Sequence, residues 1–384
     1  MSRESLGLAA FLAAAAAMAS VAPAPTPPAG PGASARAPYD AAPAAGGAVT
    51  ITLDLSAARG ILDLLSAPRL DAEAAKALET LPAVAAAIRD SKRPPDVFEH
   101  DLAAAFDEST RITIFDFRSI REDRGRWKDL LAMVASREVE LTHLASERAR
   151  ALLPADRPVT VAETIFLTFG LPGRADHLVM PEAGGANWSV VADLARALSD
   201  VQASPPAAQI QRLSRLMAGE AYQRAWAEYR AGSPAWQKRD ASLGQLEPLL
   251  KRVAETGPIA IYGVDENFFP LSVWLKRAMR DDLDELNRVA DRLVSSAGEL
   301  DARMALAAEI QKPEFTSSVA GPAGTFLSDG IVQVLGLDAY RAALAGGPRA
   351  FFEAYERASQ GRGSGLVPLG KAIRAQLAAA PPKG

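Results

Sequence analysis

The sequence predicts an α+β fold that is predominantly helical. Most segments after residue 49 space their apolar residues at i, i+3, i+4 and i+7, which is typical of amphipathic helices. Only a few short stretches alternate apolar and polar residues as strands do, so the sheet should be small. The chain of 384 residues is 49% hydrophobic, which is enough for a sizeable core.

Charge, cysteine and histidine content exclude several classes of function. The chain has 42 basic and 46 acidic residues and a net charge of −4, which gives no electrostatic reason to expect a nucleic-acid partner. It has no cysteine, which excludes disulfides, thiol nucleophiles and thiolate metal sites. The three histidines are His100, His143 and His177, so no site can draw several imidazoles from one short stretch.

The N-terminus has the pattern of an export signal. Arg3 precedes an apolar, alanine-rich run, and Ala17 and Ala19 are spaced for cleavage after Ala19. We assign residues 1–22 to a signal peptide and expect a periplasmic or secreted protein that makes no membrane contact after cleavage. The alternative is an uncleaved anchor, because the run from Leu6 to Ala22 has 17 residues, the short limit for spanning a bilayer.

Residues 23–48 are rich in Pro, Ala and Gly and predict a disordered linker. Residues 49–384 predict a single domain. We divide this domain into a helical N-terminal part, 49–155, and a part with the sheet and the candidate-site helices, 156–384.

The N-terminal part is expected to begin with a strand and to continue as helices. Residues 49–55 alternate as a strand does, and Ser56 is placed to cap a helix that ends near Leu65. Helical patterns follow over 71–90 and 95–106. Residues 126–152 predict one long helix or two joined ones, ending before Pro154.

A short β region and a long helical region make up the rest. Strands are expected at 159–169, 177–180 and 188–194, with a turn at Gly184–Gly185 between the last two. The expected helices are 207–231, 243–255, 271–294, 300–311, 324–335, 339–344, 348–358 and 366–377.

The segment Gly219–Gln223 is the most informative part of the chain. The apolar residues one and two turns earlier place Glu220 on or beside the buried face of its helix. A carboxylate on an apolar face needs a partner or a raised pKa. The plain structural interpretation is a part-buried Glu220 paired with an arginine such as Arg224, beside a close helix contact at Gly219.

The order of motifs along the chain adds a second interpretation. The β region precedes the Glu220 helix, a second helix ends in the sequence Glu255–Ala260, and Gly321–Gly324 opens a helix near the C-terminus. This order resembles bacterial zinc-dependent peptidases of the gluzincin type, generally described as a domain of unknown function. The resemblance covers roughly Val49 to Tyr355. It implies a zincin-like domain with a small sheet packed on a His-Glu-x-x-His helix, followed by a Glu-Gly-x-Ala helix that carries a third metal ligand.

Carried over by position, Gly219 and Gln223 would stand at the two histidine ligands, Glu220 at the general base and Glu255 near the third ligand. Glycine has no side-chain donor, a glutamine carbonyl is a poor zinc ligand, and the residues after Glu255 break the Glu-Gly-x-Ala spacing. The resemblance therefore implies a pseudopeptidase without a cofactor that acts by binding a peptide or protein partner. Tyr222, Trp226 and His177 are candidate binding residues, and the two aromatic residues could instead be core residues of the same helix.

Two alternatives stay open. One is a working hydrolase with a rearranged zinc site, in which His177 is a metal ligand and must lie within a few ångströms of Glu220 and Glu255. The other is a helical envelope scaffold unrelated to peptidases.

Weaker signals have plain interpretations. Asp176, His177 and Glu182 could offer carboxylates and an imidazole to a metal, but in a loop bounded by Gly and Pro they are expected to be solvated turn residues. His100 is expected at the surface and His143 beside the core. The glycine-rich segment 361–365 follows no strand and is therefore not a phosphate loop.

Overall fold

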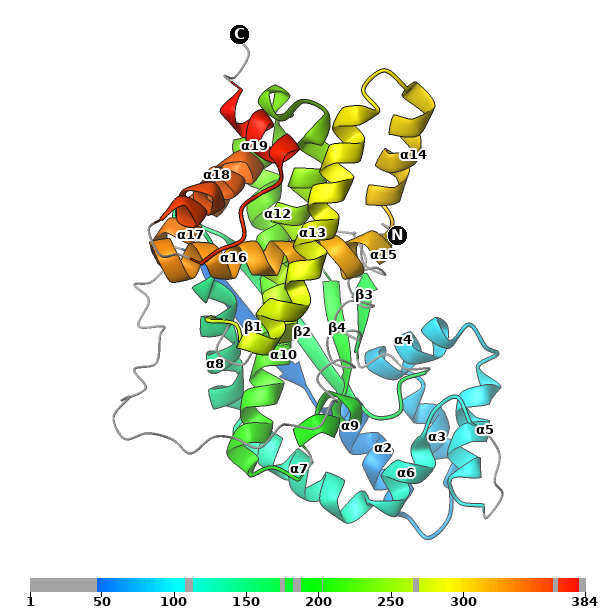
Figure 1. Ribbon diagram of the computed structural model, residues 1–384. Coiled ribbons are helices and arrows are strands. Elements are labelled where there is room, and N and C mark those ends of the chain that lie inside the picture. Colours follow the sequence, from blue (N-terminus) through cyan, green and yellow to red (C-terminus); the bar gives the residue numbers. More distant parts are fainter. Residues whose placement is uncertain are drawn as a thin grey trace. The chain divides into compact units, whose positions relative to one another are not determined.

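The computed structural model describes residues 47–107, 113–172, 177–181, 188–201, 203–264, 269–361 and 365–379 (Figure 1). The predicted signal peptide, nearly all of the predicted linker and the Gly184–Gly185 turn lie outside these residues. The predominantly helical α+β class is confirmed.

The chain divides into two compact units whose segments alternate along the sequence. Of the described residues, unit 1 takes 47–48, those within 149–160 and those from 222 onward, and unit 2 takes those within 49–148 and 161–221. A single domain over 49–384 with a division near residue 155 stays a prediction.

Unit 2 contains a four-stranded mixed sheet in the order β1-β2-β4-β3. The strands are β1 (Ala48–Asp54), β2 (Thr160–Thr168), β3 (His177–Pro181) and β4 (Trp188–Asp193). β2 runs parallel to β4 and β3 antiparallel to it, with Leu167 opposite Ala192 and Ala192 opposite His177. Side chains of directly paired residues point to the same face of a sheet. The register therefore places His177 on the same face as Leu167.

Along the sequence of unit 2, short helices lie between and after the strands. They are α2 (Ser56–Ser66), α3 (Ala72–Leu78), α4 (Pro82–Ser91), α5 (Asp96–Ala104), α6 (Phe117–Glu122), α7 (Arg124–Ser136), α8 (Glu138–Ala151), α9 (Leu194–Ala197) and the 3₁₀ turn η1 (Ser199–Val201). The pattern over 71–90 is two helices, because Pro82 fits only at the start of a helix. The pattern over 126–152 is also two helices, which meet at Arg137.

The prediction that Ser56 caps α2 is wrong. Ser56 is the first helical residue, and the carboxylate of Asp54 accepts hydrogen bonds from its backbone N at 2.8 Å and from its hydroxyl at 2.5 Å. A carboxylate two residues earlier thus satisfies a free N–H at the helix start.

Unit 1 is helical. Its elements are the second half of α10 (Pro206–Gly232), α11 (Pro234–Gln237), η2 (Ala241–Leu246), α12 (Glu247–Val264), α13 (Val273–Ser295), α14 (Leu300–Ile310), α15 (Pro313–Phe315), the π turn η3 (Thr316–Ala320), α16 (Gly321–Leu335), α17 (Leu337–Ala345), α18 (Gly347–Gln360) and α19 (Lys371–Ala378). The prediction that the second candidate helix ends near Glu255 is wrong, because α12 continues through Pro258 to Val264.

Gly257, in the segment Glu255–Ala260, and Gly324, in the segment Gly321–Gly324, meet where α12 contacts α16. A Cβ added to Gly257 would lie 2.5 Å from the carbonyl carbon of Gly324, and one added to Gly324 would lie 2.5 Å from the oxygen of Val253. The hydroxyl of Thr325 donates to the oxygen of Gly257 at 3.2 Å. The backbones of the two helices are thus in direct contact, which only glycine permits.

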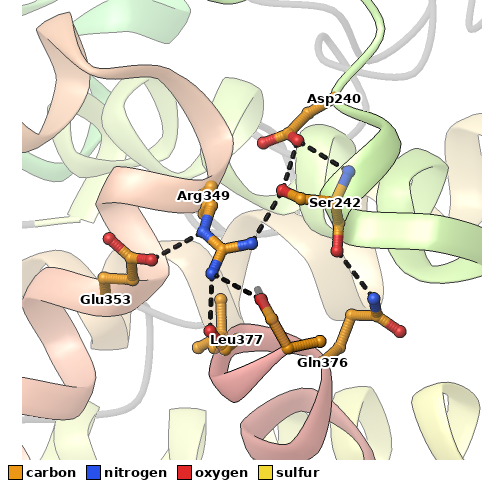
Figure 2. A network of polar contacts seen from close by, with 7 residues as sticks. Asp240, Ser242, Arg349, Glu353, Gln376 and Leu377 are labelled. Carbon is orange, nitrogen blue, oxygen red and sulfur yellow. Dashed lines mark hydrogen bonds and ion pairs between the residues drawn. The ribbon is translucent and has the colours of Figure 1, made fainter. Parts of the chain in front are cut away.

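A polar network fixes α19 (Figure 2). The Arg349 guanidinium donates to Glu353 at 2.6 Å, to the Ser242 hydroxyl at 2.7 Å and to the Leu377 carbonyl at 2.6 Å. The amide of Gln376 donates to the Ser242 carbonyl at 2.6 Å. One arginine therefore joins α18, η2 and the end of α19.

No helix in the described part of the chain is long and apolar enough to cross a membrane.

Candidate functional site

The candidate site is centred on Glu220 of α10. Its predicted burial is confirmed, because the residue is 5% exposed. Met217, one turn earlier, and Leu213, two turns earlier, are buried on the same side. Gly219 and Gln223 are half-buried, so they line the helix at the border between its buried and exposed faces.

His177 is the partner of Glu220. It is the first residue of β3 and is 5% exposed, so the expectation of a solvated turn residue is wrong for it. Its Nε2 atom lies 3.4 Å from Oε1 of Glu220. The contact forms an ion pair when the imidazole is protonated. The structure thus brings together two residues that the sequence analysis proposed for one site. The arginine pairing expected for Glu220 in the plain interpretation stays a prediction.

The sheet face of His177 carries a buried residue that the sequence analysis missed. Glu163 of β2 is only 2% exposed and alternates with Ile165 and Leu167, so it shares the sheet face of His177. A glutamate in the inward positions of a strand breaks the apolar alternation, and that signal is visible in the sequence. Unit 2 therefore buries a second carboxylate, that of Glu163, on the sheet face of His177.

The residues at the positions of the family's zinc ligands do not fit a zinc ion. Gly219 offers no side-chain donor and Gln223 offers only an amide, whereas catalytic zinc takes three His, Asp, Glu or Cys ligands. Within the described ranges, no three such residues are grouped so that they could hold a metal. Asp176 and Glu182, the candidate ligands beside His177, lie outside those ranges.

Glu255, the candidate third ligand, has an ion-pair partner in unit 1. Its carboxylate lies 2.7 Å from Nη1 of Arg230, and both side chains are largely buried. Its backbone oxygen accepts the indole N–H of Trp226 at 2.9 Å. The guanidinium carbon of Arg230 is 5.7 Å from the centre of the Trp226 ring, which adds a cation–π contact. In this arrangement Glu255 ties α12 to the second half of α10.

Tyr222 and Trp226 are fully buried in an aromatic cluster of unit 1. The ring of Tyr222 stacks on Tyr262 at 4.7 Å, and the ring of Trp226 stacks on Tyr229 at 5.5 Å and meets the edge of Trp236 at 5.0 Å. The Tyr222 hydroxyl has no hydrogen-bond partner in the described structure, and burial raises its pKa well above the usual value of 10. Both side chains therefore pack as core residues, and their role in binding stays a prediction.

The other two histidines lie on the surface of unit 2. His100 is exposed as expected. The prediction that His143 flanks the core is wrong, because its side chain is 69% exposed and lies 3.4 Å from Glu147 one helical turn later. Most of the glycine-rich segment 361–365 lies outside the described residues.

No protein-family profile, curated protein or solved structure matches the chain. The likeness to gluzincin peptidases therefore rests on the short motifs and their order.

Proposed function

We propose that this is an exported, peptidase-like protein that is catalytically inactive and acts by binding a peptide or protein partner. The observation that carries the proposal is the contact of Glu220 with His177. The residue at the position of the general base has its carboxylate against an imidazole, and the two side chains are only 4% and 5% exposed. A base in this setting has no open side from which a substrate and a water molecule could approach together.

The donor chemistry around Glu220 supports the same proposal. In zinc peptidases a metal lowers the pKa of a bound water to about 7, and the glutamate accepts the proton of that water. The positions next to and one turn after the base hold Gly219 and Gln223, which supply no strong zinc donor. Glu220 is left as a carboxylate that orients His177.

One observation favours a second candidate, a hydrolase with a rearranged site. That hypothesis requires His177 within a few ångströms of Glu220, and the distance of 3.4 Å meets this requirement. The hypothesis also requires Glu255 as a metal ligand close to His177, but the Glu255 carboxylate forms an ion pair with Arg230 at 2.7 Å. The hydrolase would need to break that ion pair before Glu255 could bind a metal, which makes it the weaker candidate.

Metal content and peptidase activity, measured together, distinguish the two candidates. The chain without residues 1–22 is purified with and without added zinc, and zinc is counted by mass spectrometry. We expect a molar ratio of zinc to protein near zero in both preparations. We also expect wild type and Glu220→Gln to hydrolyse a mixed peptide library at the same background rate. One zinc per chain that is lost in His177→Ala, with hydrolysis abolished by Glu220→Gln, would replace our proposal by the hydrolase.

Binding is the positive part of the proposal and has its own measurement. The purified chain is immobilised and exposed to the same peptide library, and retained peptides are identified by mass spectrometry. Saturable retention of a peptide class supports the proposal. Absence of retention together with absence of zinc would favour a helical envelope scaffold.

Export, and the absence of nucleic-acid and membrane partners after cleavage, belong to the same proposal. They are supported by the charged and apolar pattern of residues 1–22 and by the balanced net charge of −4. N-terminal sequencing of the protein from the periplasm or medium of an expressing bacterium tests export and locates the cleavage site.

A further inference from the structure

The outer face of α13 carries exposed charges in an unusual order. The inner face is buried and packs on α16, α19, η2 and η3 in unit 1 (Figure 1). On the outer face Arg277 and Arg280 are exposed and are followed directly by the exposed Asp281 and Asp284. The second turn of this face is therefore basic and the third turn is acidic.

This order does not stabilise the helix itself. Cations near a helix N-terminus oppose the helix dipole, and a basic residue four positions before an acidic one is the weaker orientation for a pair within a helix. Consistent with this, none of these four side chains makes an ion pair or hydrogen bond within the described residues. Other charges nearby are occupied, because Lys276 lies 3.2 Å from Asp329 and Glu285 lies 2.9 Å from Arg288.

The four free charges are arranged symmetrically about the point between residues 280 and 281. Arg280 mirrors Asp281 and Arg277 mirrors Asp284, each time with the opposite sign. When two identical helices pack antiparallel across a two-fold axis through that point, residues at equal distance from it face each other. Every arginine of one helix then faces an aspartate of the other, and the outermost facing charges lie about 5 Å from the centre along the axis.

Exposed apolar side chains stand at one end of the same face. Val273 is 84% exposed and Trp274 is 52% exposed, on the first turn of α13. In the antiparallel pair this turn lies beyond Asp284 of the partner, over its Asn287 and Arg288, so the Trp274 ring would cover the arginine side chain at both ends of the charged centre. Trp is enriched at protein interfaces because it combines a large apolar ring with a polar N–H group.

We propose that the outer face of α13 is an isologous interface at which a second copy of this chain docks antiparallel. This goes beyond the proposed function and does not depend on it. Asp282 is not part of this interface, because it lies on the opposite side of the helix from the four facing charges. It is half-buried, and its burial together with the neighbouring Asp281 raises its pKa to about 6. The partner is identified by charge complementarity, because the face is complementary to itself.

Sedimentation velocity of the wild-type chain over a wide concentration range tests the association. We expect a reversible dimer of micromolar affinity that weakens between about 0.02 M and about 0.5 M salt, as the Debye length falls from about 20 Å to about 4 Å. Trp274→Ala is expected to weaken it further. A chain that stays monomeric at every concentration and salt would overturn the proposal.

Charge reversal tests the pairing itself. The double variants Arg277→Glu/Arg280→Glu and Asp281→Arg/Asp284→Arg each turn all four attractions into repulsions. Since one exposed ion pair changes affinity by a factor of about 1.5 to 5, each double variant is expected to dimerise about 10- to 100-fold more weakly, or not at all. Mixed in equal amounts, the two variants are expected to form a heterodimer, because every facing pair is again of opposite sign.

A matched control separates this pattern from a general effect of net charge. Lys371 and Arg374 on α19 have the same three-residue spacing and are also exposed. Lys371→Glu/Arg374→Glu alters net charge as much as the arginine reversal and is expected to dimerise like wild type. Double reversals that dimerise normally, or that fail to associate when mixed although their far-UV circular dichroism is native, would refute the antiparallel interface.

Discussion

Replacing Gly257 by alanine should destabilise unit 1 through the contact between α12 and α16. The new Cβ would lie 2.5 Å from the carbonyl carbon and 2.6 Å from the Cα atom of Gly324. Carbon atoms in contact are about 3.5 to 4.0 Å apart, so the helices must separate by about 1 Å. The obstacle is backbone, and no rotamer change can relieve it.

The magnitude follows from two opposing effects. Overpacking a tightly filled contact costs about 1 to 3 kcal/mol, and a clash with backbone belongs at the upper end of that range. Alanine gains about 1 kcal/mol over glycine in the interior of a helix. We therefore expect the free energy of unfolding to fall by about 2 kcal/mol, measured as the shift of the urea midpoint by far-UV circular dichroism.

The control for this experiment is Gly298→Ala in the same unit. A Cβ at Gly298 meets nothing within 4 Å, and its φ angle is not positive. This substitution should leave stability within about 0.5 kcal/mol or raise it slightly, because alanine restricts the unfolded chain. If Gly257→Ala shifts the midpoint no more than Gly298→Ala does, the glycine-only contact between the two helices is refuted.

Three further predictions concern single side chains. Arg349→Met should lower the free energy of unfolding by about 2 to 3 kcal/mol and speed proteolysis within α19, whereas Glu353→Gln should change it by less than about 0.5 kcal/mol because that pair is half-exposed. Tyr222→Phe should leave the free energy of unfolding unchanged or raise it by up to about 1 kcal/mol, since it removes a buried hydroxyl without a hydrogen-bond partner; a clear loss of stability in urea titrations would contradict this. The folded-state pKa of Asp282 is about 6 against 3.8 for the free side chain, so the folded state binds more protons and stability should fall as pH rises from about 4 to 6. Asp282→Asn should remove this slope and be the more stable protein at pH 7 by about 1 kcal/mol, which urea titrations at several pH values would measure.

Periodicity was sufficient to predict most elements, because burial of one helix or strand face leaves a regular record in the sequence. The strand before Asp54 and the long helix around Glu220 follow directly from it. Its errors occur where local chemistry replaces periodicity. Asp54 rather than Ser56 satisfies the start of α2, and Pro258 lies inside α12, where the sequence pattern predicted an end.

The candidate site was predictable only in part. The burial of Glu220 follows from helix spacing, but its contact with His177 depends on how β3 lies beside α10, and spacing within one segment cannot encode that. The partner of Glu255 was missed for the same reason, since Arg230 is on a different helix. The segments that contain Gly257 and Gly324 indicated a family resemblance in the sequence, whereas in the structure the two glycines allow close contact between two helix backbones.

The aromatic cluster around Trp226 also gives unit 1 a built-in optical probe. Tyr222 and Tyr229 stack parallel to the indole of Trp226 at 6.4 Å and 5.5 Å, and Trp236 meets it at 5.0 Å. At these separations light absorbed by the tyrosines is passed to the indoles, which emit at short wavelength because they are fully buried. Trp274 is half-exposed and emits at longer wavelength. The short-wavelength emission therefore comes from these indoles together with the buried Trp127 of unit 2, whereas Trp274 reports on the surface of α13.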